Sequence, residues 1–107
     1  MTPAAFAKLA LSLAGATESA HGGHPDFRAG RRVFATMGYP EKGYAMVKLT
    51  PDQQKMLVAA EPDVFSPVKG GWGLRGSTTL RLAAADAKTA RSVLVMAWRN
   101  VTEKKKR

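Results

Sequence analysis

Hydrophobic and polar positions alternate along this chain with two periods, one typical of helices and one typical of strands. The first segment has apolar residues at helical spacing, at Phe6, Leu9, Ala10 and Leu13. Thr2 and Pro3 precede them, and these residues suit the cap and the first position of a helix. The pattern predicts a helix that begins at Pro3 and ends before Gly15.

Residues 17–49 change to a period of two, broken by glycines and Pro25. The segments 18–21, 26–29, 32–37 and 44–49 read as strands, and 32–37 has the clearest alternation. Gly30 and Arg31 separate two of these segments, so we expect a tight antiparallel hairpin there.

Thr50 and Gln53 form a capping box with Pro51 between them, so a second helix begins at Pro51. We expect Pro62 to end it. The helix carries a narrow apolar stripe at Met56, Leu57 and Ala60.

A glycine-rich loop, 71–76, follows between two further strand segments at 65–68 and 77–82. Its glycines have the spacing of a nucleotide-binding fingerprint, but a strand follows them where a helix is needed. The lysine of a phosphate-binding loop is also missing. We therefore interpret the segment as a basic, flexible hairpin loop that carries Trp72.

Asp86 is placed to cap a last helix, whose apolar stripe runs through Ala87, Ala90, Leu94, Ala97, Trp98 and Val101. The predicted fold class is α+β, with an antiparallel β-sheet and helices packed on one face of it. At 107 residues we expect a single domain, 1–107, with 103–107 as a frayed basic tail.

The chain has no cysteine, which excludes disulfides, thiolate metal ligands and a cysteine nucleophile. Neither a leader peptide nor an apolar run of membrane-spanning length is evident, so we expect a cytoplasmic protein without membrane contact.

Positive charge is concentrated in the second half of the chain. The net charge is +9 and the isoelectric point is near 10.4. Residues 1–63 hold seven Lys and Arg against six Asp and Glu, whereas residues 64–107 hold ten against two. Such a basic balance suggests a polyanionic partner.

The predicted nucleic-acid contacts are the cations of the hairpins and of the last helix, together with one tryptophan. They are Arg28, Arg31, Arg32, Lys69, Trp72, Arg75, Lys88 and Arg91. A basic β-ribbon fits a groove of DNA and a tryptophan can stack on a base. The alternatives are that the hairpin cations protect strand edges, that the helix cations form a solvated face, and that Trp72 folds back over its own sheet.

His21, His24 and Asp26 are the one group of residues with metal-ligand chemistry. The intervening Gly-Gly pair reads as a turn between strands, and no helical spacing preorganises the three side chains. We therefore expect no metal, no cofactor and no enzymatic activity.

Several short motifs occur in an order that resembles the MmcQ/YjbR family of small bacterial proteins. They are HPDFR at 24–28, VFAT at 33–36, LTPDQQ at 49–54, GGWG at 70–73 and AWRNV at 97–101. The resemblance implies a frataxin-like α+β fold. It also implies DNA binding through a "double wing", here the hairpins 27–34 and 65–82.

We therefore expect a non-enzymatic DNA-binding module with weak or shape-based specificity. The alternative is a protein-interaction domain that uses Tyr39, Tyr44 and Trp72 as aromatic anchors. The sequence leaves the oligomeric state open.

Overall fold

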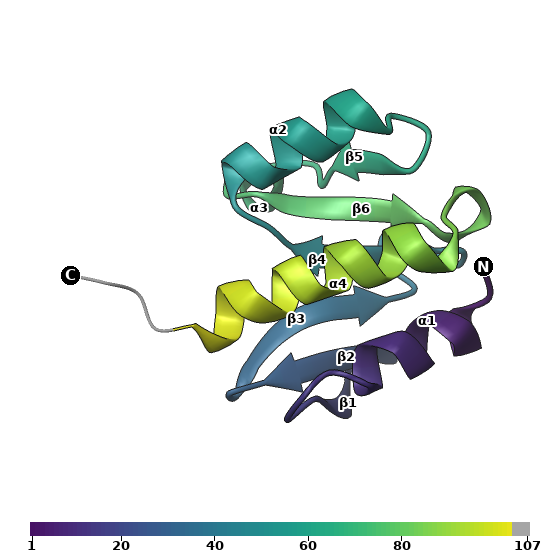
Figure 1. The fold of residues 1–107 in the computed structure, drawn as a ribbon, viewed down its shortest axis with the longest axis vertical. Helices are drawn as coiled ribbons and strands as arrows, with labels where there is room; N and C mark the ends of the chain where they lie inside the picture. The colour runs from purple at the N-terminus through teal and green to yellow at the C-terminus, as the bar shows by residue number, and fades with distance from the viewer. Residues whose placement is uncertain (104–107) are drawn as a thin grey trace.

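Six antiparallel strands form one sheet with the order β1-β2-β3-β4-β6-β5 in a computed structural model that describes residues 1–103 (Figure 1). The strands are β1 (Thr17–His21), β2 (His24–Ala29), β3 (Arg32–Met37), β4 (Tyr44–Lys48), β5 (Phe65–Pro67) and β6 (Ser77–Arg81). The predicted strands are confirmed, and so is the tight hairpin at Gly30 and Arg31, where Ala29 pairs with Arg32.

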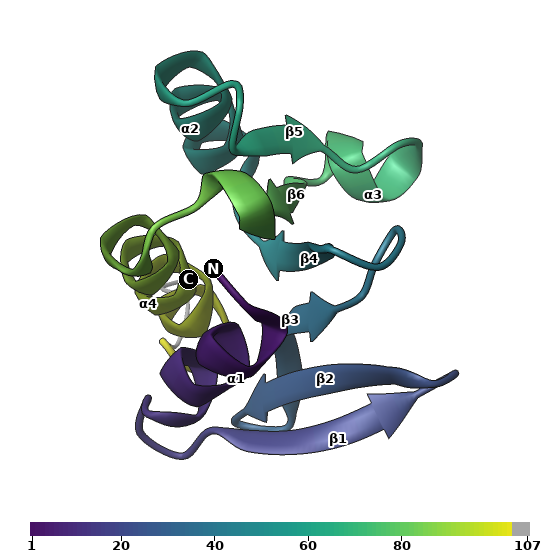
Figure 2. The ribbon, with the colours of Figure 1, turned by 90° about the vertical axis from the view of Figure 1, so that its right-hand side faces the viewer.

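Helices α1 (Pro3–Leu11), α2 (Pro51–Ala60) and α4 (Ala87–Thr102) lie on one side of the sheet, as predicted (Figure 2). A 3₁₀ turn, η1 (Leu82–Ala84), leads into α4. The short helix α3 (Gly71–Leu74), the β3–β4 loop and the β1–β2 turn project from the other side of the sheet. We call that side the open face.

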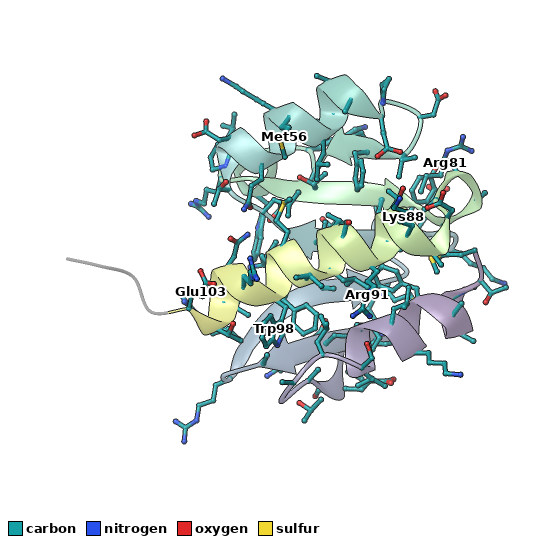
Figure 3. All side chains as sticks on the ribbon, in the orientation of Figure 1. Met56, Arg81, Lys88, Arg91, Trp98 and Glu103 are labelled. Atoms are coloured by element: carbon teal, nitrogen blue, oxygen red, sulfur yellow. The ribbon has the colours of Figure 1, made fainter. Side chains whose placement is uncertain are left out.

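The core lies between the sheet and the long helices. Its largest fully buried side chains are Phe6, Phe27, Phe34, Phe65, Leu80 and Leu94. The rings of Phe6 and Phe27 meet edge to face, with centroids 6.2 Å apart, and so join α1 to β2. Trp98 packs against this core as predicted, and its indole N–H donates to the carbonyl of Ala14 at 2.9 Å (Figure 3).

The predicted helix starts are confirmed by their capping hydrogen bonds. Thr2 and Asp86 accept from backbone N–H groups, and Thr50 with Gln53 forms the complete capping box. The first helix, however, ends at Leu11 and not near Gly15. Ser12 is its C-cap, and the Ser12 hydroxyl donates to the carbonyl of Leu9 at 2.6 Å.

The predicted apolar stripe of α2 is wrong at two of its three positions. Leu57 is partly buried and packs against the core, but Met56 is 54% exposed (Figure 3) and Ala60 is also exposed. The buried residue of this helix is Gln54. Helix α2 lies over the edge strand β5 and its neighbour β6, and Gln54 meets polar backbone of α3 and β6 there.

The glycine loop also differs from the flexible hairpin loop that the sequence indicates, because it contains α3. The side-chain amide of Gln54 donates to the carbonyls of Gly73 at 3.0 Å and Ser77 at 2.9 Å. A Cβ on Gly73 would lie 1.6 Å from the carbonyl oxygen of Val68. A Cβ on Gly76, where φ is +112°, would lie 2.0 Å from that of Leu49. Two glycines are therefore needed for close backbone packing.

No helix among the described residues is both long and apolar enough to cross a membrane.

A Gly73→Ala substitution tests this packing. We expect it to lower the free energy of unfolding by about 3 kcal/mol, because the added methyl group meets backbone that cannot move aside. The control is Gly71→Ala in the same helix, where a Cβ meets nothing within 4 Å; there we expect no loss, or a gain of up to about 1 kcal/mol. Urea unfolding measures both, and similar values for the two variants would contradict the role of Gly73.

Candidate functional site

Cations from three separate segments meet at one end of the sheet. The β2–β3 turn, the end of β4 and the start of β6 lie at this end, and Arg32, Lys48 and Arg75 line one hollow there of about 340 Å³. Arg31 lies beside Arg32 in the turn. We call Arg31, Arg32, Lys48 and Arg75 the basic end. Three of these cations were predicted as nucleic-acid contacts, and the structure brings them together.

Lys48 is the member that the sequence analysis missed. Its ammonium nitrogen lies 4.7 Å from the centre of the Trp72 ring, which is cation–π geometry. Burial, and then the nearby charge of Arg32, lower the pKa of Lys48 from its usual 10.5. The alternation of β4 predicts a half-buried strand, but the pairing of Lys48 with Ser77 on β6 depends on sheet order, which one sequence does not give.

The sequence left two positions open for Trp72, exposed for stacking or folded back over its own sheet, and its observed position is intermediate. Helix α3 presents it on the open face with 53% of its surface exposed, and Lys48 covers part of its ring. The indole therefore neither packs into the core nor stands free. It lies at the border of the basic end and remains accessible for stacking.

The cations of the basic end lack acidic partners among residues 1–103. The ion pairs found in this part of the chain are Arg28–Asp26 at 3.4 Å and Arg99–Glu103 at 4.0 Å. The basic end thus presents a positive charge that the described residues do not neutralise. Residues 104–107 of the predicted basic tail, 103–107, lie outside the described residues.

A cavity of about 360 Å³ lies on the open face next to the basic end, and we call it the open-face cavity. Its lining comes from four strands and three loops: Gly22, His24, Asp26, Thr36, Tyr39, Met46, Val68, Trp72 and Ser77. Asp26, Thr36 and Met46 are successive cross-strand neighbours on β2, β3 and β4. The sheet therefore forms the floor, and the loops form the walls.

Asp26 supplies the carboxylate of this floor and is 5% exposed. Its Oδ1 accepts from the hydroxyl of Thr36 at 3.0 Å, and its Oδ2 accepts from Nη2 of Arg28 at 3.4 Å. The Nε of Arg28 is buried without a hydrogen-bond partner. Arg28, predicted as a DNA contact, is thus partly buried and paired with a carboxylate, because the strand places both side chains on one face.

His24 belongs to the wall of the open-face cavity. Its ring meets that of Tyr39 edge to face, with centroids 6.4 Å apart. Within the part of the chain that the structure describes, no group of three or more His, Cys, Asp or Glu side chains is arranged to hold a metal ion.

The remaining predicted contacts lie elsewhere. Lys69 lines a separate hollow with Tyr39 and Tyr44. Lys88 and Arg91 project from α4, on the side of the sheet opposite to α3 (Figures 2 and 3). Both residues lie in the first two turns of α4, whereas the last turn of that helix lines the hollow of the basic end. Most of the length of α4 therefore separates Lys88 and Arg91 from the basic end.

Comparisons with known proteins support the fold. A sequence profile of the YjbR family matches residues 11–100. The crystal structure of the Deinococcus radiodurans protein DR2400, with a domain classed as DUF419, superposes with a TM-score of 0.78 at 18% identity. The match covers 96% of this chain and 80% of that one. No curated protein sequence matches the chain.

Replacing Arg32 with alanine tests the electrostatics of the basic end. We expect the pKa of Lys48 to rise in this variant, because removal of a nearby positive charge favours the protonated amine. An NMR titration of the lysine side chains measures it. Arg31→Ala removes an equal charge from the adjacent residue and is the control, for which we expect a smaller change. Equal shifts in both variants would show that Arg32 has no particular influence on Lys48.

Proposed function

The chain belongs to the YjbR family, and we propose that it binds DNA through the basic end. Arg31, Arg32, Lys48 and Arg75 contact phosphates, and Trp72 lies beside them. The observation that carries this proposal is the convergence of unneutralised cations from three segments around one accessible tryptophan. Phosphate contacts of this kind give affinity without strong sequence preference.

The two predicted wings agree with this arrangement. The hairpin 27–34 contributes Arg31 and Arg32, and the hairpin 65–82 contributes Trp72 and Arg75. Lys48, at the end of β4, lies between them and lines the same hollow. The wings therefore act as one surface, whose centre is β4.

Arg31 has a backbone conformation that favours glycine, with φ at +71°. A non-glycine residue in the left-handed region costs about 1–2 kcal/mol. Its neighbour Gly30, with φ at +58°, adopts the same region without that cost. An arginine at the second turn position therefore lowers stability, which supports a role for its charge.

The proposal assigns binding and not catalysis to the basic end. The hydroxyl of Thr50 caps α2, and Nδ2 of Asn100 donates to the carbonyl of Lys48 at 3.0 Å and to Oε1 of Gln53 at 2.8 Å. These polar groups are therefore used to hold the backbone that lines the hollow.

A protein partner is the alternative function, and the exposed apolar surface of α3 favours it. Leu74 is 84% exposed and lies two residues from Trp72. An adjacent apolar and aromatic pair is typical of a protein contact. The DNA measurement below separates the two functions, since a protein-binding surface gives no salt-dependent DNA affinity.

Fluorescence anisotropy with a labelled DNA duplex that carries a single-stranded overhang tests the proposal. We expect binding to weaken with salt, with a slope in log–log form of about −0.9 for each neutralised phosphate. The variant Arg31→Ala/Arg32→Ala/Arg75→Ala should have a smaller slope and a lower affinity at every salt concentration.

The matched control is Lys8→Ala/Lys88→Ala/Arg91→Ala, which removes the same charge from α1 and α4 on the other side of the sheet. We expect the control to keep most of the affinity and the slope. Absence of binding at low salt, or equal losses in both triple variants, would overturn the proposal.

Arg31→Gly separates binding from stability. We expect the free energy of unfolding to stay constant or to rise by up to about 1 kcal/mol, since glycine suits the left-handed turn. DNA affinity should fall, because one phosphate contact is lost. Arg32→Gly is the comparison; there a glycine at the start of β3 should lower both quantities. Arg31→Gly protein with unchanged DNA affinity would remove Arg31 from the interface. Thermal or urea unfolding and anisotropy provide the two readouts.

A further inference from the structure

We propose that the open-face cavity accepts one unpaired nucleobase from a DNA strand whose phosphates lie on the basic end. The inference rests on the proposed function and names its substrate, which is DNA with an unpaired nucleotide. It follows from the continuity of the cavity with the cationic surface, from the aromatic walls and from the carboxylate in the floor.

The cavity and the basic end share a border. Trp72 lines the cavity, and the ammonium of Lys48, which lines the cationic hollow, lies 4.7 Å from its ring. Ser77 lines the cavity and pairs with Lys48 across the strands. In a nucleotide, a single sugar separates the base from the phosphate. One nucleotide can therefore place its base in the cavity and its phosphate beside Lys48.

The walls suit a flat aromatic ligand. Trp72, Tyr39 and His24 line the cavity from three different segments, and Met46 and Val68 add apolar surface. Unstacked bases bind proteins by stacking on such rings. The volume of about 360 Å³ lies within the range of about 300–1,000 Å³ for small-ligand pockets. A base that is paired and stacked within a duplex is not free to enter such a pocket.

The floor suits a ligand with N–H groups. Each oxygen of the Asp26 carboxylate accepts one hydrogen bond, from Thr36 or from Arg28, and a carboxylate oxygen can accept two. The amino groups of adenine, cytosine and guanine each carry two N–H donors, whereas thymine has no amino group and offers only the N–H at N3. We therefore expect a base with an amino group to bind more tightly than thymine.

The test compares a blunt duplex with the same duplex carrying an overhang that contains the fluorescent base 2-aminopurine. We expect the overhang to bind about tenfold more tightly or better, as stacking of one base allows. Emission from 2-aminopurine should change on binding, because the base leaves its stack with neighbouring bases. An overhang made only of thymine should show a smaller gain.

Met46→Trp fills the floor of the cavity, and Met56→Trp makes the same substitution on the exposed side of α2. We expect Met46→Trp to keep its affinity for the blunt duplex and to lose both the overhang gain and the emission change. Met56→Trp should behave like the unaltered protein. Tyr39→Ala, on a loop, removes one wall without filling the core and should reduce the overhang gain. It is the second variant in case Met46→Trp fails to fold.

The failures are distinguishable. Equal binding of both duplexes without an emission change overturns the inference and leaves the proposed function intact. An emission change that persists in Met46→Trp, or that is not reduced in Tyr39→Ala, also overturns the inference.

If neither duplex binds, the proposed function fails. The inference is then tested with free deoxynucleoside monophosphates as ligands, and Trp72 fluorescence is measured in a Trp98→Phe background. Quenching that Tyr39→Ala reduces supports the cavity as a nucleotide site, and no quenching overturns it.

Discussion

The side-chain amide of Gln54 holds together the part of the molecule on which the candidate site depends. It donates to the carbonyl of Gly73 in α3 and to that of Ser77 at the start of β6, so one buried group from α2 fixes the middle of the glycine loop and the strand that follows it. Gly76 allows the same loop to approach the backbone of Leu49 closely. A loop held in this way keeps Trp72 over Lys48 with little freedom, which lowers the entropy cost of ordering a ligand against it.

Positive charges repel one another at the basic end, and no acidic side chain among the described residues is paired with them. Burial removes hydration from Lys48, which also lies near the charge of Arg32, and both effects lower the pKa of its ammonium group. Arg31 adds backbone strain to this like-charge group. Both costs oppose folding, and an anionic ligand removes the electrostatic one. The cations of the basic end are therefore better explained by the proposed binding than by stability.

Local chemistry predicted most of the fold, whereas the details of the site depended on distant contacts. Thr50 and Asp86 were identifiable as helix caps because capping acts within a single turn of the chain. The burial of Gln54 was not, since its partners lie 19 and 23 residues away. For the same reason helical periodicity placed Lys88 and Arg91 on one arc of α4 but did not show that the sheet separates them from Trp72. Lys48 was missed because strand alternation does not identify which face lacks long helices.

The motifs that carry the family resemblance are physically paired. Asp26 of HPDFR accepts from Thr36 of VFAT, and Asn100 of AWRNV joins Gln53 of LTPDQQ to the end of β4. Gln54 joins that same motif to Gly73 of the glycine loop. The Asp26–Thr36 pair lies in the floor of the open-face cavity, and the other two hold backbone beside the basic end and in α3. The residues of the apolar core are a different set. A core of this size needs only apolar side chains of suitable volume. Polar residues at defined positions are needed where the backbone of a binding surface must be held, and that is where these motifs lie.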